Sequence, residues 1–268
     1  MAAGVLGVLA GCGGDSKLQP VSGGLAASGT PPRRPVVDQT TPPRASLPPI
    51  PKPRPGPAKL VFAAPGGPGS TTQVALTIDD GYDPETVAGY VAFAAHTRIP
   101  ITFSPNGAYQ HVWNAHAHQL RPLIEAGQVQ IGNHTYTHLD LLTRTDGQIS
   151  ADIERNEGWI QRTFGTTSRP WFRPPFGRHS ARTDAVAGEL GFTRILMWEG
   201  SFGDSRLLTP QVLLGEARKW LTGGRIVLGH ANHPTVIHLF DQLLGLIHQR
   251  RLDPVTLDTM FGTSRAVG

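Results

Sequence analysis

Residues 74–81 read VALTIDDG, a short apolar run that ends in two carboxylates and a glycine. An apolar run of this length, bounded by a turn signal, is typical of a strand buried in a sheet. Six similar runs follow along the chain, and the segments between them have the pattern of amphipathic helices. Strands that alternate with helices predict a parallel α/β protein, either a barrel or an open sheet.

The predicted elements fill about 200 residues without an internal repeat at the residue level. The predicted strands are 74–78, 101–104, 129–132, 171–173, 194–198, 225–228 and 254–257. The predicted helices are 84–96, 110–126, 148–164, 183–190, 210–221 and 235–250. Pro84 and Pro210 stand at the start of two of these helices, where the first turn accepts proline.

The first twelve residues, MAAGVLGVLAGC, are small and apolar and end at Cys12. Residues 9–12 resemble the lipobox of bacterial lipoproteins, in which the cysteine is lipidated and becomes the mature N-terminus. The run is too short to span a bilayer. No Lys or Arg precedes Cys12, although a signal peptide normally opens with one, and a start codon upstream of Met1 would supply it. We expect an exported protein, either anchored to the membrane by a lipid or secreted; a tail with an incidental cysteine is the alternative.

Residues 13–58 are predicted to be a disordered, proline-rich tether. Twelve of the 24 prolines lie between Pro20 and Pro57, and such a segment cannot bury a core. Residues 1–58 hold six Lys/Arg and two Asp/Glu, whereas residues 59–268 hold 18 of each. Because the basic excess belongs to the tether, it does not indicate that the domain at 59–268 binds nucleic acid; it suits an anionic membrane or wall surface.

Polar clusters lie at the ends of five predicted strands. They are Asp79-Asp80-Gly81, Asn133-His134 with His138, the segment 173–177, the segment 199–204, and Gly229-His230. The C-terminal ends of the strands in a parallel α/β barrel form one face, and that face holds the active site. We therefore expect the five clusters to converge.

The types of residue in these clusters indicate metal-assisted hydrolysis. His134 and His138 are spaced i, i+4, which would place both imidazoles on one side of a helical turn. One carboxylate from residues 79–80 would complete a set of three protein ligands, which leaves positions open for water and substrate. A second carboxylate could take a proton from that water, and a further histidine could protonate the leaving group.

Four motifs, in this order, are similar to those of the polysaccharide deacetylase family, the NodB-homology group also called carbohydrate esterase family 4. They are TIDDG at 77–81, HTYTH at 134–138, RPPFG at 173–177 and LGH at 228–230. Each motif alone is a weak signal, but four in order at strand ends are a strong one. The resemblance covers about residues 72–260 and implies a distorted (β/α) barrel of about seven parallel strands.

The resemblance also implies an acid and a base. Asp79 matches the catalytic base of the family, and Arg173 matches the arginine that braces it. His230 matches the general acid, and Asp204 matches the aspartate that orients this histidine. The implied reaction removes N-acetyl groups from a polysaccharide, such as peptidoglycan or another glycan that contains N-acetylglucosamine.

The same resemblance implies a metal and an oxyanion site. Asp80, His134 and His138 match the ligands of a divalent metal, which we expect to be Zn²⁺, with Co²⁺, Mn²⁺ or Ni²⁺ as alternatives. Phe176 lies in the segment whose backbone N–H helps to bind the oxyanion. The expected partners are the glycan substrate and, through the lipid anchor only, the membrane; no oligomeric state is predicted.

One motif departs from the family pattern. The family usually has Asp-x-x-Asp-Trp where this chain has SFGDS at 201–205, so only Asp204 remains and the aromatic is gone. That aromatic helps to wall the acetyl pocket in the family, and Trp198, Phe202 and Leu207 are the candidates to replace it. Two alternatives stay open: an esterase that releases O-acetyl groups from a xylan-type polymer, and a wall-binding module that has lost activity.

Overall fold

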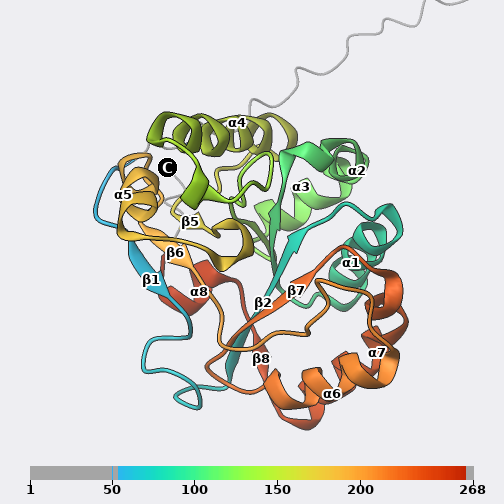
Figure 1. Ribbon diagram of the computed structural model, residues 1–268. Helices are drawn as coiled ribbons and strands as arrows, with labels where there is room; N and C mark the ends of the chain where they lie inside the picture. The colour runs from blue at the N-terminus through green and yellow to red at the C-terminus, as the bar shows by residue number, and fades with distance from the viewer. Residues whose placement is uncertain (1–49, 51–53, 264–268) are drawn as a thin grey trace, which may run out of the picture. The chain divides into compact units, whose positions relative to one another are not determined.

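The computed structural model describes residue 50 and residues 54–263 (Figure 1). The predicted lipidation at Cys12, the predicted leader at 1–12 and most of the predicted tether lie outside these residues. No helix within the described ranges is both long enough and apolar enough to cross a membrane. Part of the segment assigned to the tether packs on the domain, because the Gly56 N–H donates a 3.1 Å hydrogen bond to the Gly188 carbonyl.

The described residues form strands that pair in parallel along every ladder. The strands are β1 (Lys59–Val61), β2 (Gln73–Asp80), β3 (Ile101–Pro105), β4 (Val129–Ile131), β5 (Trp171–Phe172), β6 (Arg194–Leu196), β7 (Ile226–His230) and β8 (Asp253–Pro254). One sheet has the order β4-β3-β2-β7, with β8 also on β2, and the other has the order β1-β6-β5.

Isolated bridges join the two sheets into the expected distorted barrel. Asn133, which follows β4, pairs with Phe172 of β5. Ser201, in the segment after β6, pairs with Leu228 of β7. Both bridges are parallel, whereas a third, between Ala63 and Arg225, is antiparallel. The ladder is thus interrupted at each seam, which is the distortion of the barrel.

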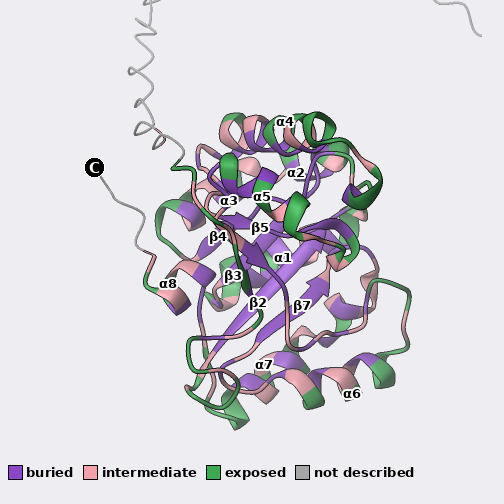
Figure 2. Ribbon diagram, turned by 60° about the vertical axis from the view of Figure 1, so that its left-hand side comes forward, coloured by how far each residue is buried: buried purple, intermediate pink, exposed green. Residues whose placement is uncertain are grey.

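Helices surround the strands, and their outer faces are exposed while β2, β3 and β7 are buried (Figure 2). The α-helices are α1 (Pro84–Thr97), α2 (Gln110–Asn114), α3 (Ala117–Glu125), α4 (Asp146–Phe164), α5 (Ala181–Glu189), α6 (Pro210–Trp220), α7 (Phe240–Gln249) and α8 (Leu257–Phe261). The 3₁₀-helices are η1 (Gly107–Tyr109), η2 (Leu141–Thr143), η3 (Pro175–Gly177) and η4 (Pro234–Leu239). The helices predicted to open near residues 84, 148, 183 and 210 are confirmed.

Side-chain caps fix where three of these helices begin. The Asp83, Thr145 and Thr209 side chains accept hydrogen bonds from the backbone N–H groups of Thr86, Gln148 and Val212. These amides have no partner inside the helix, so the caps satisfy them.

Three sequence-based boundaries were wrong. The predicted helix 110–126 is broken between α2 and α3, because Trp113 turns into the core and is fully buried. The predicted helix 235–250 opens as the 3₁₀-helix η4. The predicted strand 254–257 pairs only at its start, since the Thr256 side chain accepts from the Thr259 N–H and caps α8 instead. Strand β1 was not predicted at all.

Candidate active site

The register of β2 and β7 brings two of the polar clusters together. Asp79 on β2 stands opposite His230 on β7, and Asp80 ends β2 with a left-handed φ of 65°. Adjacent side chains of a regular strand point to opposite faces. The backbone turn at Asp80, continued at Gly81 with a φ of 91°, lets both carboxylates reach the same end of the barrel.

The turn leaves no space for a side chain at position 81. A Cβ there would lie 2.3 Å from Nε1 of Trp113, which donates a 2.9 Å hydrogen bond to the Asp80 carbonyl. Asn232 holds the turn from the other side: its Nδ2 donates to Asp80 Oδ2 at 2.7 Å, and its Oδ1 accepts from the Gly81 N–H at 3.2 Å. The second carboxylate oxygen of Asp80 is left to face the histidines.

Gly81→Ala is expected to lower the free energy of unfolding by about 1–3 kcal/mol, because the added methyl must displace a packed indole. Gly127→Ala is the matched control: Gly127 also has a positive φ, of 72°, but an added Cβ would meet nothing within 4 Å. Urea unfolding of both variants measures the difference. Equal losses would mean that backbone strain alone, and not the contact with Trp113, requires the glycine.

Asp80, His134 and His138 form the three-residue cluster that the sequence predicted, with ligand atoms within 4.8 Å of one another. His134 Nε2 and His138 Nε2 lie 3.3 Å and 3.4 Å from Asp80 Oδ1. That oxygen is buried and accepts no hydrogen bond from any described residue. Burial raises the pKa of Asp80, but the adjacent imidazoles of His134 and then His138 outweigh it, so the net pKa is lowered and the carboxylate is ionised.

The other ring nitrogen of His134 sets its tautomer. His134 Nδ1–H donates a 2.7 Å hydrogen bond to the Arg173 carbonyl, which can only accept. In the neutral ring, this leaves the lone pair of Nε2 directed at the cluster, as in histidines that bind metals. Burial lowers the pKa of His134, but the charges of Asp79 and Asp80 outweigh it and raise the net pKa, so a metal would compete with a proton for Nε2. Burial, followed by the charge of His134, lowers the pKa of His138 to about 4, so this ring is neutral near pH 7 and also has a lone pair to offer.

The expectation that the two histidines share a helical turn was wrong. Residues 134–138 form a loop, in which Thr135 and His138 have φ values of 63° and 55°. Side chains from neighbouring strand ends hold this unusual backbone: Asn133 Oδ1 accepts from the Thr135 N–H at 3.0 Å, and Asn106 Nδ2 donates to the Thr135 carbonyl at 3.0 Å. The sequence analysis did not single out Asn106, and it included Asn133 only as part of a polar strand end, with no supporting role.

Arg173 and Asp79 form a buried ion pair beside the cluster. Arg173 Nη1 donates to Asp79 Oδ2 at 3.1 Å, and Nη2 donates to Thr77 Oγ1 at 2.9 Å. Arg173 and Asp79 are 1% and 2% exposed, so solvent screens the pair little. Asp79 Oδ1 is also buried and accepts no hydrogen bond from the described residues, which leaves one oxygen of this carboxylate available.

His230 and Asp204 form a second pair, in which Asp204 is buried and His230 is partly buried. His230 Nδ1 lies 3.0 Å from Asp204 Oδ1, and the His230 backbone N–H donates to Asp204 Oδ2 at 3.1 Å. Burial lowers the pKa of His230, but the hydrogen bond and the charge of Asp204 outweigh it and raise the net pKa above the usual value. The geometry thus provides one carboxylate oxygen without a hydrogen bond, on Asp79, and one histidine that favours its protonated form, His230.

The model of the polysaccharide deacetylase family matches residues 66–195. This part of the chain belongs to the polysaccharide deacetylase family. The bifunctional xylanase/xylan deacetylase of Cellvibrio japonicus is 25% identical over 195 residues, which are 72% of this chain and 28% of that protein. The peptidoglycan-N-acetylglucosamine deacetylase PgdA of Listeria monocytogenes is 25% identical over 203 residues, 73% of this chain and 40% of that protein.

This chain therefore spans less than half the length of these two relatives. A solved pseudoenzyme of carbohydrate esterase family 4 from Bacillus anthracis has the same fold, with a TM-score of 0.65 and 19% identity. The match covers 75% of this chain and 68% of that one.

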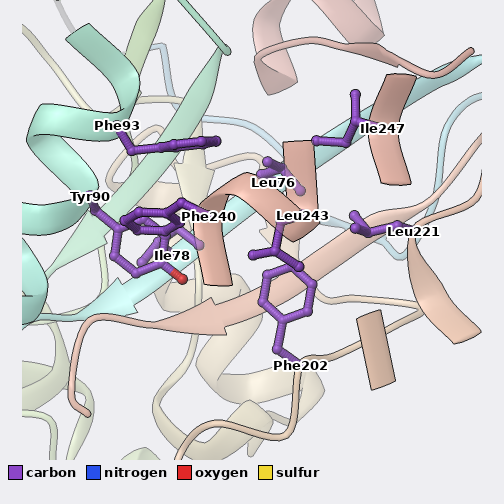
Figure 3. Close-up of a pocket in the computed structure, with 9 residues that line it drawn as sticks. All are labelled: Leu76, Ile78, Tyr90, Phe93, Phe202, Leu221, Phe240, Leu243 and Ile247. Atoms are coloured by element: carbon purple, nitrogen blue, oxygen red, sulfur yellow. The ribbon is translucent and has the colours of Figure 1, made fainter. Parts of the chain in front are cut away.

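Two features of the deacetylase family pattern can be located. Phe176, with a φ of 59°, is 61% exposed, and its ring centroid lies 4.5 Å from that of His138. Of the candidates to replace the missing aromatic, Phe202 is 2% exposed and lines an apolar pocket of the core between β2 and α7 (Figure 3). The Arg173 guanidinium lies over the Trp198 ring, with 5.5 Å between Cζ and the ring centroid, and Leu207 is 67% exposed. Phe202 is thus excluded as a wall of a substrate pocket.

Proposed function

We propose that the protein is a metal-dependent hydrolase that removes N-acetyl groups from a polysaccharide, either peptidoglycan or another glycan that contains N-acetylglucosamine. The observation that carries this proposal is the convergence of three units at one end of the barrel. They are the cluster of Asp80, His134 and His138, the Asp79–Arg173 ion pair and the His230–Asp204 pair.

The residues of the cluster fit a divalent metal. Two imidazole nitrogens and one carboxylate oxygen without a hydrogen bond match the donor set of catalytic zinc sites. We propose Zn²⁺, with Co²⁺, Mn²⁺ or Ni²⁺ as substitutes. When bound, such an ion polarises the acetyl carbonyl and lowers the pKa of water.

The surrounding side chains supply the proton transfers. Asp79 Oδ1 is free to take a proton from the attacking water, while Arg173 holds the other oxygen of this carboxylate. The backbone N–H of Phe176 is proposed to help stabilise the oxyanion. His230, held by Asp204 through its Nδ1, presents Nε2 as the group that protonates the departing amine.

The role of His230 predicts a pH dependence. Because its pKa is raised, His230 stays protonated to a higher pH than a free histidine, and activity should fall as the pH rises through that pKa. Asp204→Asn removes the charge that raises the pKa, so the alkaline limb of kcat/KM should move to lower pH. An alkaline limb that stays in place would exclude His230 as the group that titrates there.

Acetate release tests the proposed function directly. The full chain is incubated with peptidoglycan, with oligomers of N-acetylglucosamine and with acetylxylan, in the presence of Zn²⁺ or of a chelator. Metal-dependent release from either of the first two substrates is the expected result. Release from acetylxylan alone would favour the O-acetyl esterase, a candidate supported by the Cellvibrio japonicus relative. Release from none of the three would leave an inactive module, as in the Bacillus anthracis pseudoenzyme.

Export and anchoring are proposed on the lipobox-like residues 9–12 alone. If Cys12 is lipidated, the protein partitions into the membrane fraction, because an acyl chain adds about 0.8 kcal/mol per buried methylene. Cys12→Ser should move it to the soluble fraction without loss of deacetylase activity. Fractionation of cells that express both forms is the measurement, and an unmodified Cys12 in a fully soluble native protein would contradict the anchor.

A further inference from the structure

Two exposed aromatic side chains, Tyr82 and Phe176, lie beside the candidate active site. In the described part of the chain, three aromatic residues are largely exposed: Phe62 at 45%, Tyr82 at 41% and Phe176 at 61%. Tyr82 follows the turn at Asp80 and Gly81, and Phe176 packs on His138. An aromatic surface left open at a site, and not buried in a core, indicates a binding function.

The ring of Tyr82 is held in one orientation by two other loops. Its hydroxyl lies 3.2 Å from His233 Nε2, and its ring meets the His233 ring edge to face, with 5.8 Å between centroids and an interplanar angle of 88°. Tyr109 meets it at 5.8 Å and 62°. A ring that is already fixed loses little conformational entropy when a ligand packs on it.

The loops that hold this ring also carry the polar groups of the site. His233 follows Asn232, whose side chain binds both Asp80 Oδ2 and the Gly81 N–H. The Asp83 N–H also donates to the Ala231 carbonyl, at 3.4 Å, in the residue after His230. The segment that carries Tyr82 is therefore tied to the segment that carries His230 and His233, and Tyr82, at 41% exposure, stands two residues after Asp80 of the cluster.

We propose that Tyr82, held by His233 and Tyr109, is the stacking platform for a sugar ring of the glycan, adjacent to the unit that loses its acetyl group. A pyranose ring presents C–H groups on its faces and hydroxyl groups at its rim. The C–H groups suit the electron-rich face of an aromatic ring, and the rim stays in water. The inference rests on the proposed glycan substrate. It gives Tyr82 a role in substrate recognition, separate from the metal ligands, the acid and the base that the four motifs are proposed to supply.

The test is the binding of a tetramer of β-1,4-linked N-acetylglucosamine, measured by titration calorimetry. The zinc-loaded full chain carries Asp79→Asn, so that turnover does not consume the tetramer. Tyr82→Leu, which removes the flat face but stays apolar, is expected to raise Kd about fivefold to tenfold. Tyr82→Phe keeps the face and should stay within about twofold. Phe62→Leu, the matched change at an exposed aromatic after β1, should leave Kd unchanged.

Three results would overturn the platform: an unchanged Kd in Tyr82→Leu, an equal loss in Tyr82→Phe, or a tetramer that does not bind at all. Loss of bound zinc in Tyr82→Leu would also count against it, because the effect would then pass through the metal cluster. Acetate release from the chain with Asp79 intact is measured separately. Binding that depends on Tyr82 without acetate release would remove the proposed function and leave the platform.

Discussion

His134→Ala is expected to weaken zinc binding by more than about 100-fold and to abolish deacetylation. Removal of a residue that only supports a metal ligand typically lowers the affinity for the metal 10- to 100-fold. His134 is placed to be a ligand itself. Its Nε2 lies 3.3 Å from Asp80 Oδ1 and its tautomer is fixed by the Arg173 carbonyl. Equilibrium dialysis against a chelator of known affinity gives the loss of metal, and acetate release gives the rate.

The matched control for this prediction is His179→Ala. His179 also pairs with a carboxylate, with 2.9 Å between Nδ1 and Asp184 Oδ2, but it stands before α5 and outside the metal cluster. Its removal should leave both zinc content and rate unchanged. A His134→Ala protein with full metal content, or full activity in a chelator-treated wild type, would disprove the metal-dependent mechanism.

Asp79→Asn is expected to keep its zinc and to lose activity by about 10²–10⁴-fold, the usual contribution of a general base. Asp79 lies outside the cluster of three, pairs with Arg173 and keeps Oδ1 free. Asparagine preserves the size of the side chain but cannot take the proton. The comparison of bound metal and kcat in the same preparation separates this role from that of a ligand.

The neighbouring Asp80→Asn should lose both metal and rate, because Asp80 Oδ1 faces both imidazoles. His230→Ala should resemble Asp79→Asn in keeping metal, and it should slow an amide substrate more than an activated ester, since an amine must be protonated to leave. If Asp79→Asn loses its zinc while Asp80→Asn keeps it, the two carboxylates have the opposite roles.

The sequence predicted a parallel α/β protein because buried strands and amphipathic helices differ in period, and the family resemblance implied the barrel. It also predicted that the polar strand ends would converge. The structure brings Asp79, Asp80, His134, Arg173 and His230 to the same end of the barrel. This much follows from one rule, that parallel strands end on one face. The functional roles of these side chains stay predictions.

The conformation between the strand ends could not be predicted in the same way. Asp80, Thr135, His138 and Phe176 all have positive φ values although none is glycine. Such backbone is unfavourable on its own and persists only where surrounding contacts determine it. For Thr135 these contacts come from Asn106 and Asn133, distant in sequence from each other, so local patterns wrongly favoured a helical turn.

The pairing of Asp79 with His230 has a consequence for how proteins of this fold can diversify. The two residues occupy opposing positions on adjacent strands, so backbone hydrogen bonds of the β2–β7 ladder set the spacing between proposed base and proposed acid. Tyr82 and His233 lie just beyond the ladder, in the loops. Insertions or exchanges in these loops could change which polymer is accepted without altering the distance between the two proton-transfer groups. Evolution, or a designer, could therefore vary substrate choice and chemistry as separate modules of this barrel.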